Sequence, residues 1–543
     1  ALVHCQTPPT KIVEAMPTYK TAAEIPVEQF FRNPTLVAVR ISPDGKNVLS
    51  LKSWKNRLNV FITPIAEPST SKQITFVEDR DIGAAHWKNA GTVLFSKDLG
   101  GDENYHVFTA SIKTGVVKDL TPFPGSRSEI LDLLEDSSPT DILLTNNRRD
   151  KEVFDVYRIN TETGVSKMVV ENKNKIGEWL ADHDGNVRAG VALDGVNSVL
   201  YFEKYPGKPM VPIFTTDFRN QVSPVAFTAD NKRLLVATNL GRDLTALAEL
   251  DPTLPSNKFI TKIIYTHPKY DLGGADYDKA RKEINRVTVV TDRREVIFLN
   301  PEEQAEWDGI KAQLGTQGLL LGNDSQDGRK WVVKTLSDRS RGNYYVYDRD
   351  SKKLTDMGAL APWLPTELMS EVKTIHYKTR DGLNIEGYLT LPRGMAAKNL
   401  PVIVNPHGGP WARDEWGFSP ESQFLASRGY AVLKINFRGS TGYCRKFWEA
   451  SFKQWGKKMQ NDVSDGTLWL AKEKIADAKR VCIYGGSYGG YTTLAGIAFT
   501  PELYACAVDY VGVANLFTFM KTIPPYWKPF LDMMHVMVGD PVK

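Results

Sequence analysis

Short runs of alternating apolar and polar residues, separated by turn-forming residues, occupy the chain from about residue 34 to residue 360. Helical periodicity is almost absent there, so the pattern predicts an all-β region. One kind of turn recurs with a mean spacing of about 47 residues, which is the length of a four-stranded blade. The recurring turns are Asp44-Gly45, residues 89–91, residues 138–141, Asp184-Gly185, Asp230-Asn231, Asp292-Arg293 and Asp327-Gly328.

Several of these units share a second half in which a strand is followed by a tight turn, as at residues 106–115, 153–164 and 344–351. Repetition at this period predicts a β-propeller of seven blades, give or take one, because radial closure hides the edges of its sheets. We therefore assign residues 1–33 to an N-terminal segment and residues 34–360 to the propeller.

The pattern changes near residue 370, where strands begin to alternate with helical stretches, as in a mainly parallel sheet covered by helices. An antiparallel pair opens the region on either side of the Asp381-Gly382 turn. We assign residues 361–543 to a second, α/β domain with six visible strands. The later strands are expected at 401–405, 430–436, 480–484 and 505–511, with a helix at 461–474.

Length and composition narrow the classes of function. A chain of 543 residues is longer than one hydrophobic core usually organises, so we expect more than one domain. Its net charge of +4 is spread over a large surface, which argues against binding to nucleic acid. No apolar stretch of eighteen or more residues is free of charges, so we expect no membrane span. The four cysteines form no CxxC pair, so neither a metal nor a cofactor is expected. We interpret Cys482 and Cys506 as buried free thiols.

A candidate nucleophile lies in the pentapeptide Gly-Gly-Ser-Tyr-Gly at residues 485–489, which fits the pattern G-x-S-x-G. The pattern alone is weak, because glycines and serines are common. Here, however, it follows an apolar strand that ends at Tyr484 and precedes a potential helix at 491–499. This strand-turn-helix setting predicts that Ser487 is the nucleophile of an α/β-hydrolase domain.

Acyl transfer from Ser487 requires a general base, an acid that orients the base, and donors for the developing oxyanion. The backbone N–H of Tyr488 is one predicted donor, and the His-Gly-Gly-Pro loop that begins at His407 is expected to supply the other. Packing within its loop is the alternative role for His407. We do not expect His407 to be the base, because hydrolase triads run serine, acid, histidine along the chain.

The base and acid that Ser487 needs are not evident in the sequence. Only His535 follows Ser487 among the histidines, and it precedes any seventh strand, while Asp509 and Asp532 are weak candidates for the acid. In this fold the acid and the histidine follow the seventh and eighth strands. We therefore expect both beyond Lys543, and we expect this chain to be C-terminally incomplete and inactive by itself.

The N-terminal residues give limited information about the cellular compartment of the protein. Leu2 to Cys5, followed by Pro8-Pro9, are compatible with the remnant of an export signal, and trimming of the chain explains the same start equally well. A periplasmic or secreted location is slightly favoured over a cytoplasmic one, and the compartment stays open.

Three segments together resemble the prolyl oligopeptidase family of serine peptidases: residues 485–491 (GGSYGGY), residues 407–410 (HGGP) and residues 436–442 (NFRGSTG). The branch with acylaminoacyl and dipeptidyl peptidases is the most similar. The resemblance implies that the propeller caps the hydrolase domain and admits only short peptides. Related enzymes often use a tyrosine side chain as the second oxyanion donor where this sequence has His407. Whether the His407 side chain or a nearby backbone N–H donates here therefore stays open.

Peptide hydrolysis is the leading functional hypothesis, since a propeller favours peptide substrates. A carboxylesterase on the same scaffold and a non-catalytic propeller–hydrolase protein that binds a partner are the alternatives. Asp102 and Glu103, in the turn at 100–105, could hold the amino terminus of a peptide, but a solvated turn is the favoured interpretation. Residue preference, exopeptidase or endopeptidase action, and the oligomeric state, a homo-oligomer included, stay open.

Overall fold

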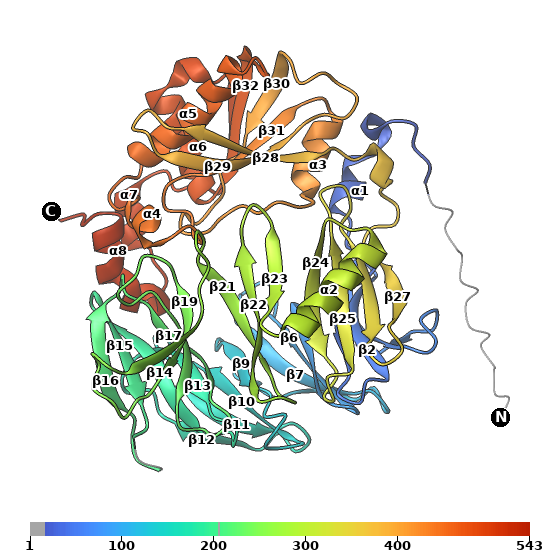
Figure 1. Ribbon diagram of the computed structural model, residues 1–543, viewed down its shortest axis with the longest axis vertical. Helices are drawn as coiled ribbons and strands as arrows, with labels where there is room; N and C mark the ends of the chain where they lie inside the picture. The colour runs from blue at the N-terminus through green and yellow to red at the C-terminus, as the bar shows by residue number, and fades with distance from the viewer. Residues whose placement is uncertain (1–16, 205–206, 543) are drawn as a thin grey trace.

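A computed structural model describes residues 17–204 and 207–542. The opening residues that are compatible with an export remnant lie outside this part. Figure 1 shows two bodies, a ring of β-sheets and an α/β domain stacked on one face of the ring. None of the helices in the described part of the chain is both long and apolar enough to cross a lipid bilayer.

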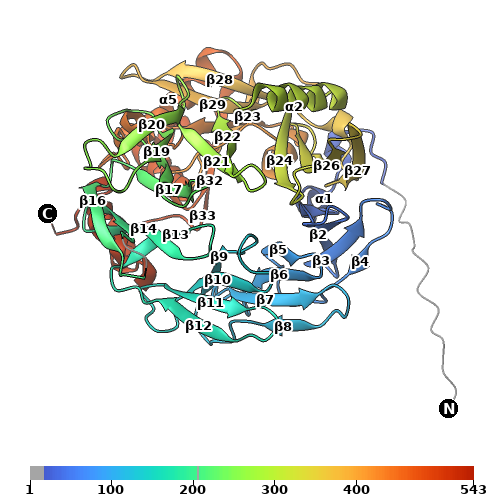
Figure 2. The same cartoon turned by 60° about the horizontal axis from the view of Figure 1, so that its bottom comes forward.

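The described propeller residues form seven antiparallel sheets in chain order, and Figure 2 shows them arranged in a ring around a common centre. The fold class predicted from the turn period is thus confirmed. The strands are, in blade 1, β1 (Val37–Ile41), β2 (Asn47–Trp54), β3 (Arg57–Pro64) and β4 (Lys72–Gln73); in blade 2, β5 (Ala84–Asn89), β6 (Thr92–Lys97), β7 (His106–Ser111) and β8 (Val117–Asp119); in blade 3, β9 (Ser128–Asp132), β10 (Asp141–Asn146), β11 (Asp155–Asn160) and β12 (Ser166–Val170); in blade 4, β13 (Ile176–Ala181), β14 (Val187–Asp194), β15 (Asn197–Phe202) and β16 (Val211–Asp217); in blade 5, β17 (Val222–Phe227), β18 (Leu234–Thr238), β19 (Ala246–Leu250) and β20 (Ile260–Tyr265); in blade 6, β21 (Leu272–Asp278), β22 (Glu283–Val290) and β23 (Arg294–Phe298); in blade 7, β24 (Gly318–Asp324), β25 (Lys330–Leu336), β26 (Asn343–Asp348) and β27 (Lys353–Ala359).

Six of the seven predicted turns join the first strand of a blade to its second strand. The exception is Asp292-Arg293, which joins the second and third strands of blade 6, because the first hairpin of that blade turns at 279–282 instead. Blade 6 also corrects the all-β prediction. Helix α2 (Pro301–Leu314) follows β23, where other blades have a fourth strand, and its N-terminus is capped by the side chain of Asn300.

Neighbouring blades are held together by apolar clusters that repeat around the ring, and the last of them joins blade 7 to blade 1. Among the residues that the structure describes, no strand is exchanged between blades 1 and 7 to close the ring. Instead, the side-chain amide of Asn323 in blade 7 donates to the carbonyl of Ile41 and accepts from its N–H, both at 2.9 Å. Side-chain packing and hydrogen bonds between blades 7 and 1, including these two, therefore close the propeller.

The α/β domain contains a six-stranded sheet with the order β28-β29-β31-β30-β32-β33. The first pair is antiparallel, as predicted, and β30, β31, β32 and β33 run parallel. The strands are β28 (Val372–Lys378), β29 (Asn384–Thr390), β30 (Leu400–Val404), β31 (Ala431–Asn436), β32 (Ala476–Gly486) and β33 (Cys506–Tyr510). The helices are α3 (Pro420–Ser427), α4 (Arg445–Glu449), α5 (Lys458–Lys472), α6 (Tyr488–Phe499), α7 (Leu516–Lys521) and α8 (Leu531–Met537), with 3₁₀ turns η2 (Thr366–Leu368), η3 (Pro501–Leu503) and η4 (Pro525–Phe530).

The described part of the N-terminal segment packs on the α/β domain. It contains the 3₁₀ turn η1 (Ala22–Glu24) and helix α1 (Val27–Phe31). Phe30 and Phe31 of α1 both contact the ring of Phe424 in α3, edge to face. Arg428, directly after α3, donates to the carbonyl of Ile25 at 2.6 Å. The segment thus packs against the hydrolase domain on the side opposite α8 (Figure 1).

A disulfide joins Cys482 in β32 to Cys506 in β33, so the prediction of two free thiols was wrong. The reason is the register of the parallel strands, which pairs these two residues directly and brings their Cα atoms to 4.7 Å. A separation of 24 residues in the sequence carries no sign of that register.

Candidate active site

Ser487 occupies the junction between β32 and α6 with φ 56° and ψ −119°, a strained conformation for a residue with a side chain. The backbone N–H of Ser487 donates to the carbonyl of Tyr510 in β33 at 3.1 Å, which helps to hold this conformation. The residue is exposed, and among the described residues its hydroxyl makes no hydrogen bond. The local geometry is therefore that of a nucleophile elbow, in which strand, tight turn and helix present a serine hydroxyl.

The glycines around Ser487 are required by close backbone contacts. A Cβ on Gly485 would lie 2.5 Å from the carbonyl carbon of Gly489, and a Cβ on Gly489 would lie 2.2 Å from the carbonyl oxygen of Pro406. Neither position has room for a side chain. The second contact also places the loop that begins after β30 directly against the elbow.

The predicted oxyanion loop indeed lies beside Ser487. An ideal Cβ built on Gly408 would be 3.5 Å from the Cβ of Ser487 and 4.0 Å from its Oγ. The side-chain amide of Asn405 donates to the carbonyl of Tyr484 at 2.8 Å and thereby fixes the start of this loop to the end of β32. The structure thus brings together the elbow and the His-Gly-Gly-Pro loop, which are about 80 residues apart in the sequence.

The imidazole of His407 is engaged at both nitrogens. Nδ1 lies 2.7 Å from the carbonyl oxygen of Gly408, and Nε2 lies 3.0 Å from Oγ of Ser440. Burial lowers the pKa of His407, so the ring is neutral and carries one N–H. Because a carbonyl only accepts, Nδ1 must donate to that of Gly408, so Nε2 carries no hydrogen and shares the one hydroxyl hydrogen of Ser440 with the carbonyl of Phe437, 2.8 Å from Oγ. The ring, which also stacks on Phe437, has no N–H left for an oxyanion.

The segment at 436–442 is held by a buried arginine with two carboxylates. Arg438 donates to Asp462 of α5 at 2.6 Å and 2.8 Å, and to Asp381 at 2.9 Å through each of two nitrogens. The hydrogen bonds from Arg438 keep the pKa of Asp381 well below its usual range. The bridge fixes the loop whose Ser440 contacts His407, so it supports the elbow indirectly.

A second buried cluster connects the loop after His407 to the propeller. Arg413 donates to the carbonyls of Val290 and Thr291 in blade 6 at 3.0 Å and 3.1 Å. It also donates to Glu386 of β29 at 3.3 Å and to the hydroxyl of Tyr443 at 2.9 Å. Sequence reasoning missed this cluster. The one available signal was that Arg413 follows the His-Gly-Gly-Pro loop by three residues.

The weak candidates for base and acid lie elsewhere. Asp532 of α8 approaches Gly195 of blade 4, to within 3.4 Å of an ideal Cβ there, so it belongs to the contact with the propeller. The carboxylate of Asp509 lies against the backbone of Gly490 in the first turn of α6. His535 is partly exposed on α8. Among the described residues, no imidazole is hydrogen-bonded to the Ser487 hydroxyl.

Asp102 and Glu103 are exposed in the loop between β6 and β7. Asp102 accepts hydrogen bonds from the backbone and side-chain nitrogens of Asn104, at 3.0 Å and 3.1 Å. These are the local contacts of a turn, and neither carboxylate lines the cavity described next. The solvated-turn interpretation fits these contacts.

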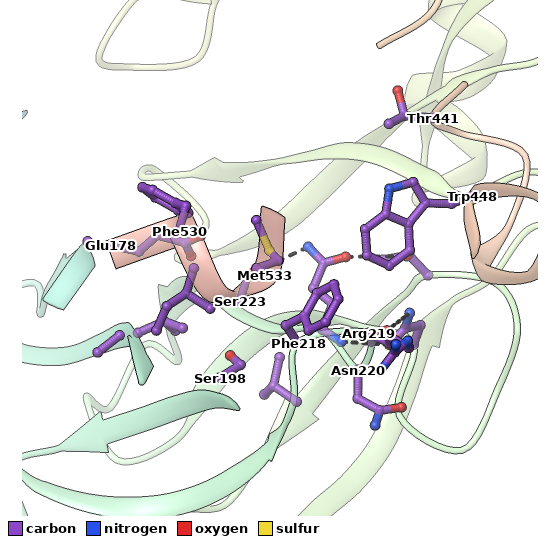
Figure 3. A pocket seen from close by; sticks show the side chains of 18 of the residues that line it. Glu178, Ser198, Phe218, Arg219, Asn220, Ser223, Thr441, Trp448, Phe530 and Met533 are labelled. Atoms are coloured by element: carbon purple, nitrogen blue, oxygen red, sulfur yellow. Dashed lines mark hydrogen bonds between the residues drawn. The ribbon is translucent and has the colours of Figure 1, made fainter. Parts of the chain in front are cut away.

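A cavity of about 890 Å³, which we call the chamber, lies between the propeller and the hydrolase domain. Blades 3 to 6 form one wall, and the loop at 441–445 with Trp448 and η4–α8 forms the other (Figure 3). Arg413 and Thr441, from the two loops that border the elbow, reach the chamber, whereas Ser487 itself does not line it. The chamber thus lies next to the two loops that border the elbow of Ser487.

The fold and the elbow together define a propeller-bearing α/β hydrolase of the serine type. A sequence model described as the prolyl oligopeptidase family matches residues 416–534. The chain is 34% identical over 532 residues to dipeptidyl aminopeptidase BIII of Pseudoxanthomonas mexicana, across 95% of this chain and 75% of that protein. The chain belongs to the prolyl oligopeptidase family of serine peptidases.

Of two further similarities, one covers only part of the chain and the other concerns the fold alone. Over 147 residues, which are 27% of this chain and 20% of the relative, it is 31% identical to the acylamino-acid-releasing enzyme of Mus musculus. The crystal structure of a puromycin hydrolase matches with a TM-score of 0.71 and 16% identity, covering 96% of this chain and 84% of that one. The latter match concerns the fold alone.

Proposed function

We propose that this protein hydrolyses short peptides through an acyl-enzyme on Ser487. The observation that carries the proposal is the strained, exposed Ser487 at the strand-to-helix junction, with the loop of Gly408 against it. The Ser487 oxygen attacks the scissile carbonyl carbon, and its proton passes to a base. The C–N bond then breaks, the protonated amine leaves, and water hydrolyses the ester.

The oxyanion is stabilised by backbone donors in this proposal. The N–H of Tyr488 is the first of α6, where helix N–H groups have no intrahelical partner and the helix dipole favours negative charge. The second donor is a backbone N–H of the loop at 407–409, because both nitrogens of the His407 ring are already engaged. His407 then acts as a positioning residue for this loop.

A fluorophosphonate probe tests the nucleophile in the product of the complete reading frame, which we call the complete protein. We expect one labelled residue, Ser487, and no labelling in Ser487→Ala. Loss of the nucleophile should lower peptide turnover by a factor of about 10⁴ to 10⁶. Labelling of another serine, or unchanged turnover in Ser487→Ala, would contradict the proposal. Tyr488→Phe is the matched control, since it changes a neighbouring side chain but no backbone donor.

The nature of the substrate needs a separate comparison. A serine peptidase should cleave both the peptides and the matched activated esters with the same acyl group, whereas a carboxylesterase would cleave only the esters. One relative is named a dipeptidyl aminopeptidase and another an acylamino-acid-releasing enzyme. The two names leave open whether the amino terminus of the substrate is free or acylated.

We further expect the 543-residue chain, produced alone, not to turn over peptides. Without an imidazole to accept its proton, the Ser487 hydroxyl stays a neutral alcohol. The oxyanion donors then supply only the small part of the rate enhancement that does not depend on the base. If the reading frame continues beyond Lys543, the added residues should bring the missing base and acid. Clear peptidase activity of the mass-verified 543-residue chain would overturn this expectation and direct the search to His407 and His535.

A further inference from the structure

The disulfide between Cys482 and Cys506 joins the two strands whose ends meet at the nucleophile elbow. Cys482 lies on β32, which ends at Gly486, and Cys506 is the first residue of β33. From the cross-link the two strands run parallel and in register to the pair of Gly486 with Tyr510. At about 3.3 Å per residue, the cross-link lies roughly 13 Å from the elbow along both strands.

Strand β33 helps to hold Ser487 in its strained conformation. The backbone N–H of Ser487 donates to the carbonyl of Tyr510 at 3.1 Å, directly after the last register pair. A residue in a sparsely populated conformation persists only where its surroundings fix it. A shift of β33 by one residue would move this carbonyl by about 3.3 Å and break the hydrogen bond. The conformation of Ser487 therefore depends on the register of β33 against β32.

The last residues before the elbow depend on β33 for their strand pairing. The ladder between β30 and β32 ends at the pair of Val404 with Ile483, whereas the ladder with β33 continues to Gly486. Gly485 and Gly486 have no side chains to interlock with β33, and register is weakly specified in glycine-rich strands. A covalent bond between two directly paired residues permits a single register. The disulfide therefore fixes the register that the glycines leave weakly specified.

We infer that the Cys482–Cys506 disulfide positions the nucleophile elbow, so that its reduction lowers turnover without weakening substrate binding. The inference rests on the proposed function in taking Ser487 as the nucleophile. The two cysteines are positioning residues, since neither touches the reacting atoms. Because the N–H of Tyr488 directly follows Ser487, a displaced elbow moves the nucleophile and the first oxyanion donor together. Neither β32 nor β33 lines the chamber, so substrate binding there should be unaffected.

Reduction by a dithiol, such as dithiothreitol, allows both states to be compared in one polypeptide. The S–S bond accepts two electrons and two protons and becomes two thiols, while the dithiol is oxidised to a cyclic disulfide. Alkylation of the new thiols followed by mass spectrometry shows which bond has been reduced. Removal of the reagent and reoxidation regenerate the starting form.

The experiment uses the complete protein, at a temperature at which circular dichroism shows both forms to be folded. We expect the reduced form to react with a fluorophosphonate at Ser487 about ten- to a hundredfold more slowly. Its kcat for peptides should fall by a similar factor while KM stays unchanged, and reoxidation should restore both rates. A disulfide that only stabilises the fold would lower Tm on reduction and leave both rates unchanged, which would contradict the inference.

The double variant Cys482→Ser, Cys506→Ser should behave like the reduced form and lose its response to the dithiol. Cys444→Ser is the matched control, because Cys444 is a free thiol in the described part of the chain. It should keep the wild-type ratio between the rates of the oxidised and reduced forms. If the double variant does not fold, the reduced wild-type protein decides alone.

Three results would each overturn the inference: equal rates in the oxidised and reduced forms, wild-type rates in the double variant, or a dithiol effect that persists in the double variant. Absence of labelling at Ser487 in the oxidised protein would overturn the proposed function as well. Failure of this inference alone and failure of the proposed function are therefore distinguishable.

Discussion

The two cavities that border the propeller differ in the residues that line them. A second cavity of about 800 Å³, which we call the far mouth, is lined by propeller residues, and some inner strands reach both cavities. In β21, for example, Leu272 lines the chamber and Asp276 lines the far mouth. Propeller residues alone line the far mouth, whereas the hydrolase domain contributes to the chamber.

At the far mouth several charged groups bind another charged group or a backbone carbonyl of the propeller. Lys279, in the first hairpin of blade 6, forms an ion pair with Glu135 of blade 3, across the ring. Lys88 donates to the carbonyls of Leu133 and Ser138. Tyr277 of the same blade 6 hairpin stacks on His183 of blade 4 at 4.8 Å.

The contacts of Lys279 and Tyr277 join blades that are not neighbours, so we interpret the far mouth as a structural closure. The comparison teaches that the volume of a cavity does not identify a binding site. The two cavities are similar in size, but propeller residues alone line the far mouth, where an ion pair spans the ring, whereas the hydrolase domain contributes to the chamber.

The largest expected effect concerns substrate size. If substrates bind in the chamber behind a closed far mouth, the complete protein should cleave peptides of a few residues to a few tens and spare folded proteins. Mass spectrometry of digests from a ladder of peptides and a casein-sized chain measures this limit. Efficient cleavage of the native, casein-sized chain would contradict the closure.

Removing Arg413 should cost the most stability of any change at the chamber. Arg413→Ala deletes the guanidinium between the hydrolase loop and blade 6 and leaves Glu386, which is almost fully buried, without that cation. Breaking a buried pair of this kind costs about 3–5 kcal/mol. Denaturant unfolding measures the loss, with the exposed Arg329→Ala as the control. A loss below about 1 kcal/mol would show that the cluster is not a structural link.

Glu178→Gln, a change on the propeller wall of the chamber, should stabilise the protein at neutral pH. Because burial raises the pKa of Glu178, the folded state binds its proton more tightly, and stability falls as pH rises through the folded pKa. The destabilisation is absent below the ordinary glutamate pKa of about 4.3. Thermal unfolding should thus show a higher Tm for the variant at pH 7 and equal values at acid pH. A lower Tm at pH 7 would indicate a structural role for Glu178.

The smallest effect is expected at the far mouth. Lys279→Ala removes a partly exposed ion pair, which contributes at most about 1 kcal/mol. Amide exchange in the hairpin of β21 and β22 should become faster, while peptide affinity stays unchanged. The exposed Lys232→Ala serves as the control. A change in peptide affinity or substrate size in Lys279→Ala would mean that ligands use the far mouth.

Much of the fold could be predicted because its cause is local. Alternation and the Asp381-Gly382 turn identified β28 and β29 nearly to the residue, and glycine spacing identified the elbow at Ser487. The disulfide, in contrast, depends on the register of two parallel strands, which the sequence does not display. Helix α2 was missed because it is a single insertion in a repeating β pattern.

The contacts that distinguish the two cavities join residues far apart in the chain. Arg413 meets Val290 across 123 positions, and Lys279 meets Glu135 across 144. Local pattern therefore predicted the elbow at Ser487 and the scaffold, whereas the contacts between distant blades and between the two domains required the assembled structure.

Hydrogen-exchange mass spectrometry of Ser487→Ala, with and without a bound short peptide, tests the contrast between the two cavities most directly. The account predicts slower exchange in the chamber-facing strands β13 and β17 and in the loop at 441–448, with no change at residues 133–138 or in the hairpin turn at 279–282. Protection at the far mouth with none at the chamber would contradict the account.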